Sequence, residues 1–237
     1  MKKFLQKILG SKETPAVNAS RDLRQRSPRV RIPSLDRSVF ISSNGKRFPL
    51  RNLSETGMAL LCQGERFPEE MNGSIQVGEE QVYVELLVVR REGDEVGVSI
   101  VDGASEVRGL LRRFFAEEFH ALEMTEVDVT HQKAVDLGRP RWFYAPGNYE
   151  LFLVEHEGAV IRFELGWGSD LIAYGDKGLR YGKVEREQRE GMSHAGSALV
   201  NWMEQVSPEQ KLKAVRILEN IPSLDTSLRQ RLQALIR

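Results

Sequence analysis

Residues 52–62, with the sequence NLSETGMALLC, determine the fold more than any other stretch of the chain. The polar half, NLSETG, consists largely of residues that favour turns. The apolar half, MALLC, has strand character, and so does the segment from Arg47 to Leu53 that precedes the turn. The stretch therefore predicts two strands, at 47–53 and 57–62, joined by a short turn.

The same pattern continues on both sides of this stretch. Strand character recurs at 39–41, 74–77, 82–89 and 96–101, and it is strongest in VYVELLVV at 82–89. Glycine and asparagine separate several of these runs, as at Asn44-Gly45 and Asn72-Gly73. Six short strands without intervening helices predict an antiparallel sheet or a small barrel.

One amphipathic helix is predicted after the last of these strands, from a cap at Ser105 to about Leu122. Its apolar residues recur at helical spacing: Val107, Leu110, Leu111, Phe114, Phe115, Phe119 and Leu122. We expect this face to lie on the barrel, because a free helix would expose three phenylalanines to water.

A second region begins near Thr125. Strands are predicted at 141–144, 149–155, 160–167, 171–174 and 179–184, followed by helices from about Glu185. Ser207-Pro208-Glu209-Gln210 forms a capping box, and Asp225 is expected to cap the last helix. The last two helices carry apolar faces, which we expect on their own sheet, with a homodimer contact as the alternative.

The expected organisation is thus an N-terminal tail or linker at 1–20, a first domain at 21–124 and an α+β domain at 125–237. The first ten residues, MKKFLQKILG, are interpreted as a tail, because so short a helix is marginal as a membrane anchor.

Composition excludes some classes of protein. Hydrophobic residues make up 41% of the chain, as in an ordinary globular protein, and no apolar stretch is long enough to predict a membrane span. Lys+Arg and Asp+Glu are both 34, and this balance argues against a surface devoted to DNA. A single cysteine, Cys62, excludes an intrachain disulfide and is compatible with the reducing cytoplasm.

An arginine-rich segment, RDLRQRSPRVRIP at 21–33, precedes the first strands, and 22 residues separate Arg29 from Asn52. The two features together resemble the PilZ family. That family pairs an RxxxR motif ahead of a six-stranded barrel with a (D/N)xSxxG motif on an early strand, which NLSETG matches in full. GMALLC, VGVSIV and the following helix also fit, so that the resemblance covers residues 21–122 and implies a mainly β fold with α.

The resemblance implies a bacterial, cytoplasmic receptor for cyclic di-GMP that is not an enzyme and needs no cofactor. Guanidinium groups bind phosphate bidentately, donate to guanine and stack on bases. Arg29 is therefore expected to bind phosphate or guanine, with Arg24 and Arg26 assisting. Asn52 and Ser54 would contact guanine.

Gly57 would shape the turn, because glycine permits positive φ and close backbone approach. Ligand binding is expected to order residues 21–31 against the barrel and to change the relation of the barrel to residues 126–237. A protein partner is also expected.

Gln25 stands where the first RxxxR arginine belongs. The first alternative is accordingly a degenerate PilZ domain that binds a protein and no nucleotide. Two others remain open, namely an enzyme in residues 126–237 under PilZ control and DNA binding through Arg21–Arg31. The four histidines show no metal-ligand spacing, and Gly166–Asp170 lacks the lysine of a phosphate-binding loop, so no catalytic or metal site is predicted.

Overall fold

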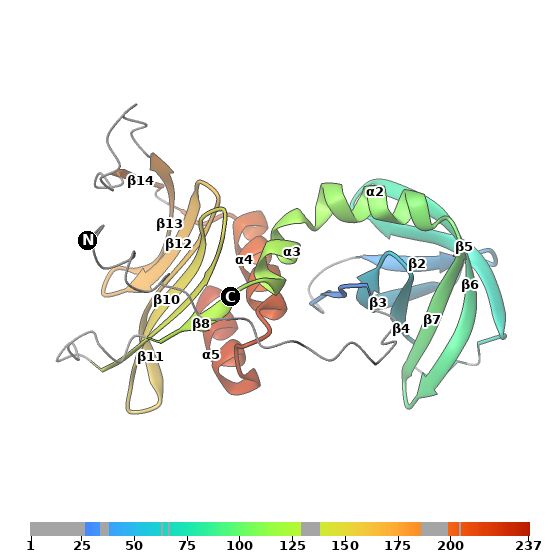
Figure 1. Ribbon diagram of the computed structural model, residues 1–237, viewed down its shortest axis with the longest axis horizontal. Helices are drawn as coiled ribbons and strands as arrows, with labels where there is room; N and C mark the ends of the chain where they lie inside the picture. The colour runs from blue at the N-terminus through green and yellow to red at the C-terminus, as the bar shows by residue number, and fades with distance from the viewer. Residues whose placement is uncertain are drawn as a thin grey trace, which may run out of the picture.

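The computed structural model describes residues 27–33, 38–62, 64–65, 67–128, 138–185, 199–203 and 205–237. These residues form two units that lie side by side, a barrel and a sheet, with helices between them (Figure 1).

The first unit is a closed antiparallel barrel. Its strands are β2 (Val39–Ser42), β3 (Arg47–Ser54), β4 (Gly57–Leu61), β5 (Glu70–Val77), β6 (Glu80–Glu92) and β7 (Glu95–Asp102). The order is β3-β2-β5-β6-β7-β4, and pairing of β4 with β3 closes the ring. The predicted six-stranded barrel is therefore confirmed, although β5 and β6 extend beyond the predicted runs.

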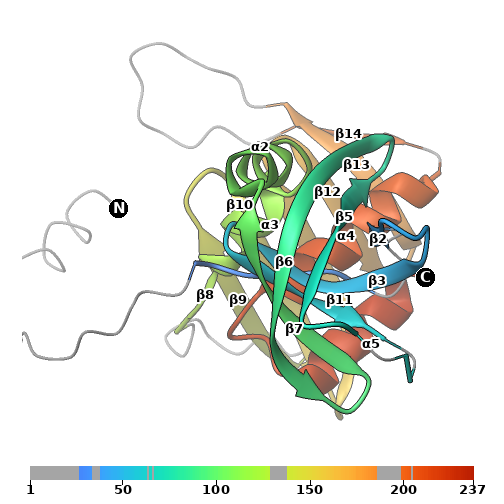
Figure 2. The same ribbon diagram turned by 90° about the vertical axis from the view of Figure 1, so that its right-hand side faces the viewer.

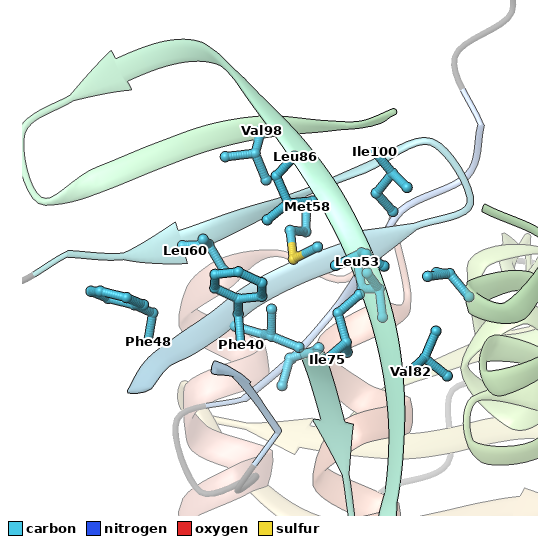
Figure 3. Close-up of a cluster of buried hydrophobic side chains, with 14 of the residues drawn as sticks. Phe40, Phe48, Leu53, Met58, Leu60, Ile75, Val82, Leu86, Val98 and Ile100 are labelled. Atoms are coloured by element: carbon cyan, nitrogen blue, oxygen red, sulfur yellow. The ribbon is translucent and has the colours of Figure 1, made fainter. Parts of the chain in front are cut away.

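Alternating side chains of these strands fill the barrel. Figure 3 shows Phe40, Leu53, Met58, Leu60, Ile75 and Leu86 among the side chains of this core, and each is at most 2% exposed. Residues of the following helix, Val107, Leu110 and Leu111, belong to the same cluster. The core thus explains the alternating apolar pattern of the strands.

A seventh strand, β1 (Val30–Arg31), adds to β3 outside the closed ring. The sequence did not predict it, because two residues in an arginine-rich segment give no periodic pattern.

The helix after the barrel differs from its prediction. It is broken at Phe115 into α2 (Ala104–Phe114) and α3 (Ala116–Leu122). Ser105 is not the cap, because α2 begins after Gly103, whose φ of 86° is left-handed, and the Ser105 hydroxyl donates to Glu106. The predicted apolar face nevertheless lies on the barrel along both halves, because Phe119 and Leu122 of α3 pack against the same core as the apolar residues of α2. Ala121 of α3 packs in the core of the second unit with Met124.

The second unit is an antiparallel meander covered by helices. Its strands follow chain order across the sheet: β8 (Thr125–Val127), β9 (Arg139–Ala145), β10 (Tyr149–His156), β11 (Ala159–Trp167), β12 (Asp170–Gly175), β13 (Gly178–Glu185) and β14 (Leu199–Met203). The five predicted strands are all present. The helix predicted from about Glu185 is wrong for residues 199–203, because β14 pairs there with β13, and residues 186–198 lie outside the described part of the chain.

Two helices, α4 (Pro208–Asn220) and α5 (Thr226–Ile236), complete the second unit. Both predicted caps are confirmed. The Ser207 hydroxyl accepts from the amide of Gln210 at 3.2 Å, and the Asp225 carboxylate accepts from the amide of Leu228 at 2.8 Å. The apolar faces of both helices are buried in one cluster with the strands, so the chain's own sheet covers them and they do not offer the alternative dimer contact. Figure 2 shows both helices behind the barrel.

Candidate functional site

The pairing of β1 with β3 brings the arginine-rich segment next to the NLSETG motif. Val30 lies opposite Leu53, and Arg31 lies opposite Asn52. Val30 and Leu53 are both 0% exposed and point into the barrel, so that Arg31 and Asn52 share the outer face. Arg29 is exposed and immediately precedes β1, and the register places it beside the Ser54 end of β3.

Arg24 and Arg26, the two arginines predicted to assist, lie outside the described residues. Of the predicted cations, only Arg29 can therefore be placed relative to the motif.

Asn52 offers an unused hydrogen-bonding group. Its side chain is half-buried, and its Oδ1 atom is shielded from water without a hydrogen-bond partner in the described part of the chain. A shielded amide oxygen without a donor carries a free-energy penalty. A ligand with an N–H group at this position would remove that penalty.

Ser54 and the two turn residues after it are held by the barrel itself. Ser54 is 0% exposed, and its hydroxyl donates to the carbonyl oxygen of Gly57 at 2.9 Å. The carbonyl oxygen of Thr56 accepts from the amide of Ile100 at 3.0 Å. The turn is thus fixed against β7, and Ser54 positions it.

Of the two reasons expected for a glycine at position 57, positive φ and close backbone approach, the structure supports only the second. Its φ is outside the left-handed region, so positive φ is not the explanation. It is the first residue of β4 and pairs with Ser99 of β7. A Cβ atom on Gly57 would lie 2.5 Å from the carbonyl oxygen of Val98, which real Cβ contacts do not reach. Close backbone approach therefore selects glycine.

Three arginines near the motif were not among the predicted site residues. Arg31 lies opposite Asn52. Arg51 is the extra residue of a bulge in β3 and lies 3.6 Å from Glu95. Arg108 of α2 contacts Glu55 of the motif at 3.0 Å. Arg31 belongs to the arginine-rich segment that the sequence shows. Arg51 and Arg108 could not be predicted in this way, because a strand bulge and the packing of α2 bring them near the motif.

A cavity of about 320 Å³ lies where the barrel meets the helices of the second unit. We call it the junction cavity. Its lining comes from both units: Arg31, Pro33, Arg51, Glu219, Thr226, Arg229, Gln230, Gln233 and Arg237.

One side chain beside this cavity clamps the lead-in strand. Asn220 is 1% exposed. Its Oδ1 atom accepts from the backbone amide of Arg31 at 2.7 Å, and its Nδ2 atom donates to the backbone carbonyl of Arg31 at 3.0 Å. The amide of Asn220 thus occupies the place that a neighbouring strand would take beside β1.

Two ion pairs join α4 to α3 on the same side. Lys213 lies 2.8 Å from Glu117, and Arg216 lies 2.6 Å from Glu118, which is 0% exposed. Burial raises the pKa of Glu118, while the positive charge of Arg216 opposes the rise. Lys213, Arg216 and Asn220 follow i, i+3, i+7 spacing, so one face of α4 contacts both α3 and β1.

The second unit offers no comparable constellation. Within the described ranges, no group of three or more histidine, cysteine, aspartate or glutamate residues could hold a metal ion. His120 stacks on Tyr149 with ring centroids 4.4 Å apart, and His131 and His194 lie outside the described residues. Nor is any helix of the described part long and apolar enough to cross a membrane.

A cavity of about 740 Å³ lies on the barrel at the opposite end of β3 from the motif. Its lining includes Phe48, Phe67, Met71, Leu87 and Val101. Beside it, β6 and β7 carry exposed apolar side chains, with Val89 62% and Val101 66% exposed. This apolar surface is separate from the arginine-rich face.

A closed six-stranded barrel with a basic lead-in strand and a following helix defines the fold class of the first unit. Residues 23–117 match the family model of the PilZ domain, and this part of the chain is a PilZ domain. As a family, PilZ domains are cyclic di-GMP receptors and binding modules, not enzymes.

Two further comparisons concern the whole chain. No protein with a curated description matches the sequence. Among solved structures, an uncharacterised Legionella protein is similar, with 16% identity and a TM-score of 0.34 over 39% of this chain and 98% of that chain.

Proposed function

We propose that the PilZ domain of this chain binds cyclic di-GMP on the face where β1 meets β3, and that the chain is a receptor without catalytic activity. The observation that carries the proposal is the register of Arg31 opposite Asn52, which places the arginine-rich lead-in beside the NLSETG motif. The family match supports the choice of ligand.

The proposed roles follow from the chemistry of each side chain. Arg29, exposed beside the Ser54 end of β3, binds a phosphate or stacks on a guanine, and Arg24 and Arg26 assist from the preceding segment. Asn52 presents its unpartnered Oδ1 to a guanine N–H. Ser54 and Gly57 fix the shape of the turn beneath the ligand, and the buried Ser54 hydroxyl reaches guanine only if this turn shifts.

The second unit would sense the ligand through β1. Asn220 holds the backbone of Arg31, and Arg31 lies opposite Asn52. A ligand that orders the lead-in therefore acts on a strand that α4 already grips. We infer that binding changes the contact between the PilZ domain and residues 126–237.

Titration calorimetry with cyclic di-GMP on the full chain tests the proposal. Arg29→Ala removes a charged donor, and we expect about ten- to a hundredfold weaker binding. Arg90→Ala is the matched control, because Arg90 is an exposed arginine of the same barrel that pairs with Glu92 on the β6–β7 hairpin. If the wild type gives no saturable heat, or if both variants bind as the wild type does, the proposed site is wrong.

A degenerate PilZ domain that binds a protein is the second candidate, and two observations favour it. Gln25 replaces an arginine of the RxxxR motif. The exposed side chains Tyr83, Leu87, Val89 and Val101 on β6 and β7 provide an apolar surface of the kind that partner proteins cover. Absence of nucleotide binding by the wild type, together with a partner complex that Val89→Asp and Val101→Asp disrupt, would decide for this candidate.

A further inference from the structure

The junction cavity contains more positive charge than its lining neutralises. Arg31 and Arg51 enter it from the barrel, and Arg229 and Arg237 enter it from the α5 side. Glu219 is the one carboxylate side chain of this lining, and it accepts a hydrogen bond from Gln233 at 3.0 Å. The lining of the cavity thus combines four guanidinium groups with a single acidic side chain, and one of the four, Arg51, lies 3.6 Å from Glu95 outside the lining.

Arg229 makes this excess costly, because it is nearly buried. It is 7% exposed, and its guanidinium donates to the carbonyl oxygens of Leu218, Ile221 and Leu224 at 2.9–3.2 Å. These contacts fix the group without giving it an ion-pair partner. In the described ranges, no carboxylate lies within ion-pair distance of Arg229 or Arg31.

Electrostatics agrees with the geometry. Burial is the main cause that lowers the pKa of Arg229; the charge of Glu219 opposes it, the charge of Arg31 adds to the lowering, and the charge of Asp225 opposes it. A buried cation without a direct ion-pair partner is unfavourable, and an anion in the cavity would supply that partner.

We propose that the junction cavity is a binding site for a phosphate-bearing ligand, built jointly by the PilZ domain and α5. Forked guanidinium groups suit phosphate oxygens, and the amide of Gln230 adds a donor on the α5 side. About 320 Å³ is at the small end of ligand sites, which suits a phosphate or pyrophosphate group better than a whole dinucleotide. Because both units line the cavity, an occupant fastens α5 to the barrel.

The proposal does not depend on cyclic di-GMP binding at the barrel face. Arg31 lines the cavity and also lies opposite Asn52, so one phosphate of a cyclic dinucleotide is one source of the anion. Inorganic pyrophosphate is the other.

Titration calorimetry of the full chain with pyrophosphate, and separately with cyclic di-GMP, distinguishes these sources. The variants are Arg51→Ala and Arg237→Ala, which alter exposed side chains on opposite walls of the cavity, and Arg162→Ala is the control on β11. Circular dichroism confirms that each variant is folded. We expect saturable binding that each cavity variant weakens about tenfold or more and that the control leaves unchanged.

Weakened binding of pyrophosphate identifies an independent anion site, and weakened binding of cyclic di-GMP alone identifies a phosphate of the dinucleotide as the occupant. Either result supports the inference. The inference would be overturned if the wild type bound neither pyrophosphate nor cyclic di-GMP, or if neither cavity variant altered the binding. Cyclic di-GMP binding that Arg29→Ala abolishes but Arg51→Ala and Arg237→Ala leave intact would overturn this inference while preserving the proposed function.

Discussion

Replacing Asn220 with alanine should weaken the attachment of the lead-in strand β1, although Asn220 is far from β1 in sequence. Asn220 makes three hydrogen bonds, two with the backbone of Arg31 at 2.7 and 3.0 Å and one with the carbonyl oxygen of Arg216 at 2.8 Å. The Asn220→Ala variant loses all three and leaves the amide of Arg31 without its partner.

The expected magnitude follows from these contacts. Each hydrogen bond contributes about 1 kcal/mol net, so their loss costs about 3 kcal/mol. Alanine is the better helix former by roughly 0.5 kcal/mol, which offsets part of this. We therefore expect the free energy of unfolding to fall by about 2.5 kcal/mol.

Hydrogen exchange at the Arg31 amide measures the local effect directly, because that amide donates to Asn220. We expect its exchange to accelerate about ten- to a hundredfold, which corresponds to about 1.4–2.8 kcal/mol. Asn201→Ala is the matched control. Asn201 is exposed and bonds only the Glu185 side chain in the hydrogen bonds described, so its loss should change stability by about 0.5 kcal/mol or less.

Unchanged protection of the Arg31 amide in Asn220→Ala would refute the reasoning, even if the variant were less stable. Asn220 would then act within α4 only, and the route from the PilZ domain to the second unit would not pass through this side chain.

Three further changes have defined outcomes. Gly57→Ala forces a Cβ atom to within 2.5 Å of the Val98 carbonyl oxygen, and urea unfolding should show a loss of about 1–3 kcal/mol. Arg216→Ala leaves the buried carboxylate of Glu118 without its partner and should cost about 3–5 kcal/mol. Burial already raises the pKa of Glu118 in the folded state, so this cost should grow as the pH rises above the ordinary glutamate value of 4.5, as urea unfolding at two pH values would show. Asp225→Ala removes the cap of α5 and should cost about 1 kcal/mol in thermal unfolding near neutral pH. Its hydrogen bond from the Leu228 amide is the main cause of a lowered pKa, so this contribution exists above the ordinary aspartate range and is lost as the pH falls through the folded-state pKa.

Matched variants make these outcomes specific. Gly175→Ala should be tolerated, because its Cβ atom would meet nothing closer than 4.0 Å. Asp225→Asn keeps an equally good cap without a titrating carboxyl, so it should retain stability but not the acid dependence. An Arg216→Ala variant as stable as Arg162→Ala would contradict the assigned role of the buried pair.

The barrel was predictable because local patterns decide it. Its strands alternate apolar and polar residues, and asparagine and glycine mark several of the turns between them. The same holds for the strands of the second unit from β9 to β13 and for the caps at Ser207 and Asp225. In each case the information lies within a few residues of the element it determines.

The elements that the sequence did not predict depend on contacts with residues outside their own segment. β1 has two residues and exists only through pairing with β3, and β14 exists through pairing with β13. The break at Phe115 was hidden because apolar spacing continues across it, and Phe119 and Leu122 of α3 pack against the barrel core as the residues of α2 do. The candidate site itself stays a prediction. Local motifs predict Arg29 and Asn52 as site residues, whereas the positions of Arg31, Arg51 and Arg108 follow from register, a bulge and helix packing.

The position of α4 predicts that the two units respond together to the proposed ligand. Its apolar residues are buried in the core of the second unit, while Arg216 and Asn220 reach α3 and β1. Any movement of β1 relative to β3 must either break the bonds to Asn220, at the cost calculated above, or move α4 against a core that includes Val215 and Leu218. Because close-packed cores resist small displacements, the first path is the less costly one. If a ligand binds between Arg29 and Asn52 as proposed, we expect it to act on the junction by strengthening or releasing the hold of Asn220 on β1.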